Sequence, residues 1–171
     1  MKQFRTLLIA LSFVFGAIAL SNAQDSKVAH INTQELIETM PAYKSAMSQL
    51  EKLESTYRAD IDDLYKEAQS KNQRYQQEAV NQTEEENAKR AQELQQDQQK
   101  IVQFQQNAQK ELQKKESELL RPVYEKARTS IQKVAREKGY DYVLDSTTGA
   151  GGVILADGYD LMPDVKKDLG I

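Results

Sequence analysis

The apolar positions in the middle of the chain recur three and four residues apart, which is the spacing of one face of an α-helix. From Pro41 to Val80 they form one stripe with polar gaps at Glu54, Lys71 and Glu78. Its members are Tyr43, Met47, Leu50, Tyr57, Ile61, Leu64, Ala68 and Tyr75. This pattern predicts a long amphipathic helix whose apolar stripe packs against another helix.

A second stripe with the same spacing follows residue 83. Its members are Ala91, Leu94, Ile101, Ala108, Leu112 and Leu119, with polar gaps at Gln98, Gln105 and Lys115. The polar run Asn81-Gln82-Thr83 separates the stripes, and Thr83 followed by Glu86 is typical of a helix start. We therefore predict an antiparallel helical hairpin over residues 41–138, paired as a weak coiled coil, with its tip near residues 81–83.

Glycine and proline mark where these helices should bend or end. No glycine occurs between Gly16 and Gly139, as expected for long uninterrupted helices. Pro122 lies inside the second helix, and we expect a kink there. Beyond Pro122 the apolar spacing resets, which predicts that the end of this helix packs on a compact part of the protein. Gly139 is expected to end the helix as a left-handed cap.

Short strand patterns flank the hairpin. Residues 24–40 contain the run Lys27–Asn32, which predicts a strand, and Asn32 is a suitable cap for a short helix after it. Residues 139–171 contain two further strand patterns, Tyr140–Asp145 and Val153–Ala156, with a turn at residues 148–152 between them, and Pro163 opens a terminal helix. The predicted fold is mainly α, with a long helical hairpin and a small β body built from both ends of the chain.

Such short strands cannot bury two faces in a single chain. Phe104 is the only phenylalanine after residue 23 and tryptophan is absent, so large apolar side chains are scarce. We therefore expect several copies of the chain to pool their strands. The candidate interface residues are Val28, Ile31, Val143, Leu144, Val153 and Ile154.

The N-terminus has the pattern of a secretory signal peptide. Lys2 and Arg5 precede the apolar run Leu7–Leu20, and Ser21-Asn22-Ala23 supplies the small residues that a signal peptidase requires. We predict a signal peptide over residues 1–23, cleaved after Ala23; an uncleaved anchor is the alternative. Because the chain has no cysteine for lipidation or disulfides, an exported protein of the bacterial periplasm is the favoured interpretation.

The net charge and the potentially reactive side chains limit the classes of function that the chain can have. Loss of Lys2 and Arg5 leaves 21 basic residues of the original 23 against 26 acidic ones, about −5 for the mature chain, which argues against nucleic acid as a partner. His30 is the only histidine and has no ligand-spaced acidic or cysteine partners, so a structural role is favoured. The Gly149–Gly152 run lacks the lysine of a phosphate loop. We predict no enzyme, metal site or cofactor.

The second helix carries a distinctive polar surface. Ten glutamines lie between Gln92 and Gln113, and they form either an ordinary solvated helix face or an uncharged surface that touches unfolded chains weakly. Val102 and Phe104 flank Ile101 but lie off the predicted stripe. They either broaden the packing of the hairpin or face a cavity.

This order of elements resembles the Skp (OmpH-like) family of periplasmic chaperones. The resemblance rests on the signal peptide, the segment KVAHIN with its short helix, the long hairpin, and the tail segments YDYVLDS, GGVILADGYDL and PDVKKDL. It implies a trimer with a central body of strands and three helical hairpins around a cavity, which holds unfolded outer-membrane proteins without ATP. Members are often strongly basic, whereas this mature chain is acidic, which argues against contact with lipopolysaccharide or a membrane surface.

The predicted function is that of an ATP-independent periplasmic holdase that binds unfolded outer-membrane proteins and prevents their aggregation. The alternative is a structural or adaptor coiled-coil protein of the cell envelope. The candidate client-binding residues are Tyr65, Tyr75, Val102 and Phe104, which lie beside the predicted stripes or at their gaps.

Overall fold

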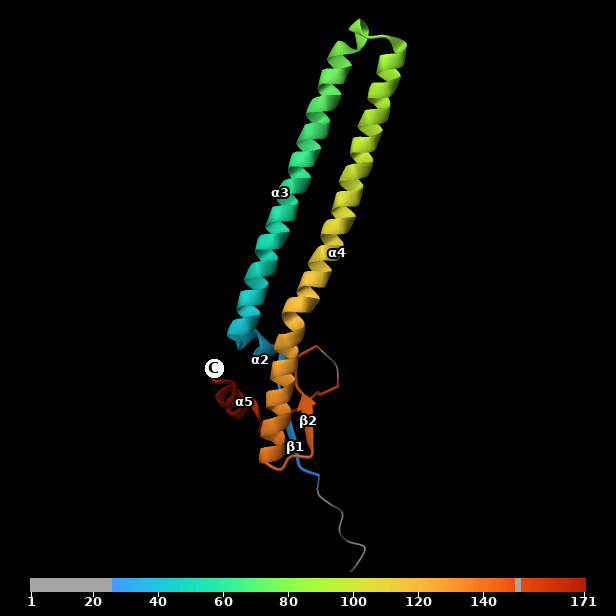
Figure 1. The fold of residues 1–171 in the computed structure, drawn as a ribbon. Helices are drawn as coiled ribbons and strands as arrows, with labels where there is room; N and C mark the ends of the chain where they lie inside the picture. The colour runs from blue at the N-terminus through green and yellow to red at the C-terminus, as the bar shows by residue number, and fades with distance from the viewer. Residues whose placement is uncertain (1–25, 150–151) are drawn as a thin grey trace, which may run out of the picture.

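Two long antiparallel helices dominate the computed structural model, which describes residues 26–149 and 152–171. Helix α3 spans Pro41–Glu78, the 3-10 turn η1 spans Ala79–Asn81, and helix α4 spans Glu84–Glu137. Figure 1 shows these helices as a hairpin that projects from a small body. The predicted helical hairpin is confirmed, and its two helices are joined by η1 and residues 82–83. The predicted signal peptide lies outside the described residues.

Local capping residues explain where the helices begin and end. The Asn32 side chain accepts a hydrogen bond from the Glu35 amide at 3.0 Å and starts helix α2 (Thr33–Thr39). Thr83 caps α4 in the same way through the Glu86 amide at 3.2 Å. Gly139 has a φ of 75° and ends α4 with the two reversed hydrogen bonds of a Schellman motif, as predicted.

Helix α4 outlasts α3 and enters the body. It continues through Pro122 as one helix, and Figure 1 shows a gentle change of direction between its yellow and orange parts. Beyond the proline, its buried residues contact the body, as the reset of the apolar spacing predicts. They include Val123, Ala127 and Val134. None of the helices in the described ranges is long and apolar enough to cross a bilayer.

The facing positions of α3 and α4, here called the seam, differ from the predicted stripes by one residue in places. Ala46 is buried and Leu53 is half-buried, whereas Met47 and Glu54 are exposed. On α4, Ala91 and Gln98 are exposed. A straight helix drifts by about 20° per heptad against a strict seven-residue repeat, so a count of apolar positions loses the seam by one residue.

The body contains a three-stranded parallel sheet with the order β2-β1-β3. Strand β1 (Val28–Ile31) lies between β2 (Tyr142–Asp145) and the two-residue strand β3 (Tyr159–Asp160). One sheet face packs on the end of α4, on α2 and on the terminal helix α5 (Met162–Leu169). The most completely buried large side chains of this core are Ile31, Leu36, Leu161 and Val165.

The predicted strand at Val153–Ala156 is wrong, because this segment forms no strand in the structure. The second edge of β1 is instead taken by β3, where the Leu161 amide donates to the His30 carbonyl at 2.9 Å. Leu161 is fully buried, so its burial fixes this register in preference to the run around Ile154. The predicted turn at residues 148–152 lies partly outside the described residues.

Candidate functional site

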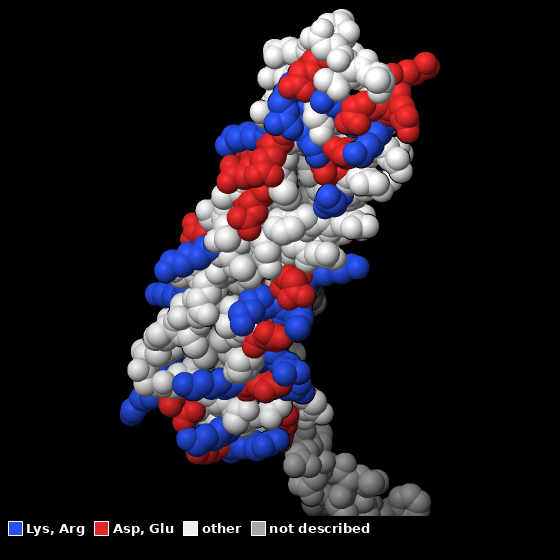
Figure 2. Space-filling model, turned by 45° about the horizontal axis from the view of Figure 1, so that its top comes forward, with Lys and Arg blue, Asp and Glu red and all other residues white. Residues whose placement is uncertain are grey.

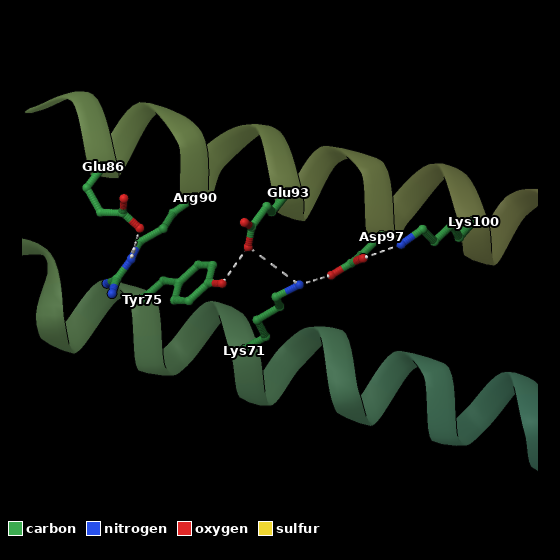
Figure 3. A network of polar contacts seen from close by, with 7 residues as sticks. All are labelled: Lys71, Tyr75, Glu86, Arg90, Glu93, Asp97 and Lys100. Carbon is green, nitrogen blue, oxygen red and sulfur yellow. Dashed lines mark hydrogen bonds and ion pairs between the residues drawn. The ribbon is translucent and has the colours of Figure 1, made fainter.

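Close to its tip, the hairpin is held together largely by a cluster of polar side chains (Figure 3). Lys71 on α3 pairs with Asp97 on α4 at 2.6 Å and with Glu93 at 3.8 Å. The Tyr75 hydroxyl donates a hydrogen bond to Glu93 at 2.7 Å. We call this cluster the distal network; its members are Lys71, Tyr75, Glu86, Arg90, Glu93, Asp97 and Lys100.

Arg90 closes the distal network on the side of the tip. Its guanidinium lies 4.6 Å from the centre of the Tyr75 ring, which is a cation–π contact. The same group pairs with Glu78 at 2.9 Å and with Glu86 at 3.6 Å. Its Nη1 atom is buried and has no hydrogen-bond partner among the described residues. This orphan donor reduces the net stability that Arg90 adds.

The contacts of the network shift the pKa values of its members. The hydrogen bond between Lys71 and Asp97 raises the pKa of Lys71 and lowers the pKa of Asp97. The hydrogen bond between Tyr75 and Glu93 raises the pKa of Tyr75 and lowers the pKa of Glu93. These directions favour the ionised carboxylates, the charged lysine and the neutral tyrosine. The cross-helix contacts are therefore strongest near neutral pH.

Toward the body, the seam becomes apolar. Ile101 and Ala108 of α4 are buried. The rings of Tyr57 and Phe104 meet edge to face across the hairpin, with centroids 6.1 Å apart and an interplanar angle of 75°. This geometry is favourable for aromatic pairs. Burial and aromatic packing thus replace charge pairing as the main contact between the helices.

The four predicted client-binding residues fall into two groups. Tyr65 and Val102 expose 48% and 47% of their surface. Tyr75 belongs to the distal network, and Phe104 packs on Tyr57. Of these four residues, only Tyr65 and Val102 therefore offer free apolar surface, although the Tyr65 hydroxyl also accepts a 3.3 Å hydrogen bond from Gln105.

The base of the hairpin contains a groove that the sequence pattern did not predict. Its apolar lining residues are Tyr43, Met47, Leu50 and Leu112, and its volume is about 690 Å³. We call it the basal groove. Residues 113–118 of α4 are all exposed, so this stretch of α4 does not pack closely on the facing part of α3. Met47, placed in the stripe by its spacing, is 42% exposed in this groove. In the sequence, the polar run at residues 113–118 is the feature that could have indicated this groove.

The body also exposes apolar surface. Val28, Tyr142 and Leu144 lie exposed on the sheet face opposite to the core, and Ile154 is fully exposed in the loop before β3. Val143 and Val153 are half-buried, Val143 against the core. Ile31 was predicted at the subunit interface, but it is only 1% exposed. We remove Ile31 from that surface because it packs inside its own chain.

A second hollow lies beside β2 in the body. Its volume is about 440 Å³, and its lining includes Ile37, Tyr124, Ile131 and Tyr140. Tyr124 is about half exposed. Val143 and Asp145 of β2 contribute to the lining, and β2 is an edge strand of the sheet in the described part of the chain, so this apolar surface lies beside an edge strand.

His30 lies in a contact between strands, and charges of both signs cover the surface. The imidazole Nδ1 of His30 lies 3.2 Å from the Ser146 hydroxyl, a contact between β1 and the end of β2. The described residues include no group of three or more His, Cys, Asp or Glu side chains that could hold a metal ion. Figure 2 shows acidic and basic side chains interspersed over one face of the molecule. On this face, the mixture differs from the basic stripe of a nucleic-acid-binding protein.

Comparison with known proteins gives the family. The family described as outer membrane protein (OmpH-like) matches residues 27–169 of the 171-residue chain. The protein belongs to the OmpH-like family. Among solved structures, the chain is similar to a provisionally assigned outer membrane chaperone (OmpH-like) from Caulobacter crescentus CB15, with a TM-score of 0.72 and 19% identity. The match covers 84% of this chain and 83% of the other. No curated protein matches the sequence. Membership in the OmpH-like family supports a chaperone role in general terms.

Proposed function

We propose that this protein is an ATP-independent holdase of the bacterial periplasm. In this proposal, it binds unfolded outer-membrane proteins in the space between helical hairpins and prevents their aggregation. The observation that carries it is the scattered apolar surface of the hairpin. Exposed apolar side chains occur singly along both helices, at Met47, Tyr65, Val102 and Tyr124. An unfolded β-barrel chain carries alternating apolar side chains, and many weak contacts can hold it without reading a sequence.

The same distribution favours a chaperone over an adaptor of the cell envelope. An adaptor that binds one folded partner needs a continuous docking patch with a small number of dominant residues. The exposed apolar residues of α3 and α4 are instead separated by charged and amide side chains. Weak, dispersed contacts also allow a client to leave without an energy source, because no single contact dominates the affinity.

We further propose that the protein is a homotrimer, assembled through the body. The proposal is supported by the exposed apolar sheet face with Val28, Tyr142 and Leu144, and by the hollow beside the edge strand β2. Open strand edges and exposed apolar sheet faces are surfaces that proteins ordinarily cover. Light scattering of the mature protein should give three times the chain mass. A stable, folded monomer at micromolar concentration would contradict the trimer.

The direct test of the function is an aggregation assay with an unfolded outer-membrane β-barrel protein diluted from urea. The protein should suppress light scattering by the client without ATP. A variant with serine at Tyr65, Tyr75, Val102 and Phe104 should hold the client less well, with Tyr65 and Val102 accounting for most of the loss. Circular dichroism must show intact helices, because Tyr75 and Phe104 also support the hairpin. Full suppression by a folded fourfold variant would exclude these residues as the client surface.

The periplasmic location is a proposal that rests on the N-terminal sequence pattern. Cleavage after Ala23 predicts a mature protein that begins with Gln24. N-terminal sequencing of the protein from a periplasmic fraction checks this. A chain that retains residues 1–23 in the membrane fraction would favour the anchor.

A further inference from the structure

The basal groove has an apolar floor and a strongly acidic rim. Four glutamates contribute to its lining, together with a single lysine, Lys44. The glutamates are Glu38, Glu51, Glu54 and Glu116. Three of them come from α2 and α3, and Glu116 comes from α4, so carboxylates stand on both sides of the groove.

Only one of these four carboxylates, that of Glu54, is paired with a cation among the described residues. Glu54 pairs with Arg58 at 2.7 Å, and Glu38 accepts a hydrogen bond from Gln34 at 2.8 Å. Glu51 and Glu116 form no ion pair with any described residue. These two carboxylates therefore keep their full attraction for an incoming cation at the rim of an apolar surface.

We propose that the basal groove binds an extended peptide segment in which a large apolar side chain stands next to lysine or arginine. This inference rests on the proposed holdase function and names the kind of client segment that the hairpin base prefers. The apolar side chain contacts Met47 and Leu50 on the floor, and the neighbouring cation faces Glu51 and Glu116.

The charge complementarity selects this occupant over others. An acidic segment would bring carboxylates toward a rim with four glutamates and one lysine, which is unfavourable. A neutral apolar segment gains only the contact with the floor. A long basic side chain can also lay its methylene stem on the apolar lining while its charge stays at the rim.

The experiment uses the mature full-length protein and two short fluorescent peptides. Both peptides are glycine–serine chains with two leucines, and they differ in having either two lysines or two glutamates beside the leucines. Fluorescence anisotropy at low salt measures their affinities. We expect the lysine peptide to bind about tenfold more tightly, because two exposed charge contacts that are favourable for lysine become unfavourable for glutamate. Salt at 1 M should remove most of this preference.

Two variants separate the rim from the floor. The double variant Glu51→Gln/Glu116→Gln should reduce the preference for the lysine peptide by about threefold or more. Its matched control, Asp60→Asn/Glu111→Gln, removes the same charge from exposed sites of the same two helices and should keep the preference. Met47→Ser should weaken both peptides equally, whereas Val80→Ser at the exposed tip should weaken neither.

The outcomes distinguish this inference from the proposed function. If the protein suppresses client aggregation but binds both peptides equally, the inference is wrong and the holdase proposal stands. An unchanged preference in the folded Glu51→Gln/Glu116→Gln variant also overturns the inference. If the protein neither suppresses aggregation nor binds either peptide, both proposals fail. Loss of the preference in the double variant alone supports the basal groove as the site.

Discussion

Toward the body, α3 and α4 pack through buried Ile101 and the Tyr57–Phe104 ring pair, whereas near the tip the same helices meet through Lys71, Tyr75 and Arg90. Apolar contacts give stability but little directional information, since they are roughly proportional to buried area. Ion pairs and hydrogen bonds fix which residues oppose each other but add little stability in contact with water. The hairpin therefore has a firm proximal part and a distal segment that is correctly paired but easily opened.

The largest effect should follow from removing apolar packing. Ile101 is 3% exposed, and Ile101→Ala should lower the free energy of unfolding of the hairpin by about 2–4 kcal/mol. Val102→Ala at the exposed neighbouring position should change it by less than about 0.5 kcal/mol. Urea unfolding followed by circular dichroism compares the two. Equal losses would mean that the proximal seam is not held by burial.

A smaller and more local effect should follow from Asp97→Ala, which removes the partner of Lys71 and Lys100. The opening free energy of residues 71–97 should fall by about 0.5–1.5 kcal/mol, with the proximal seam unchanged. Amide hydrogen exchange reads both regions in one experiment. Glu111→Ala, at an exposed site of α4, is the control and should leave the exchange of both regions unchanged. A loss of protection throughout the hairpin would contradict independent opening of the distal segment.

Acid should loosen the distal segment before the proximal part. Glu93 and Asp97 have pKa values below the ordinary 4.5 and 3.8, so their stabilising contribution is present above those values and is lost as the pH falls through the lowered ones. Tyr75 and Lys71 have pKa values above the ordinary 10.0 and 10.5, so their contribution is lost as the pH rises through the raised values. Hydrogen exchange of the distal segment, corrected for its intrinsic pH dependence, should show a plateau of protection between these limits. In Asp97→Ala, the loss of protection on the acidic side should be smaller.

Salt should have the smallest effect. Raising the ionic strength from about 0.05 M to 1 M shortens the screening length from more than 10 Å to about 3 Å. We expect the distal segment to lose a few tenths of a kcal/mol, while the apolar proximal seam keeps its stability. If salt lowered the stability of the proximal seam as much as that of the distal segment, the two parts would not differ in how they are held together.

The hairpin could be predicted because the sequence features that specify it are local. Spacing identified both helices, the tip and the cap at Gly139, since capping and periodicity depend on neighbouring residues. The distal network was not predicted, because a count of apolar positions treats Lys71 only as a gap and overlooks Arg90 and Asp97. Strand β3 was missed because it has two residues, and its pairing depends on the burial of Leu161. The basal groove depends on how far α4 leaves α3 uncovered. The apolar pattern of one helix does not show how that helix lies against its neighbour.

The central position of β1 in a parallel sheet has a consequence for folding. The Lys27 amide donates to the Asp141 carboxylate, a contact between residues 114 positions apart, whereas the Tyr75–Glu93 contact spans only 18. Local contacts form first because their loop-closure entropy is small. We therefore expect the helix–helix contacts near the tip to form before the strands pair. A formed hairpin brings the chain on either side of it together and shortens the effective loop between β1 and β2. Shortening α3 and α4 by equal numbers of turns should therefore leave the rate of β1–β2 pairing nearly unchanged.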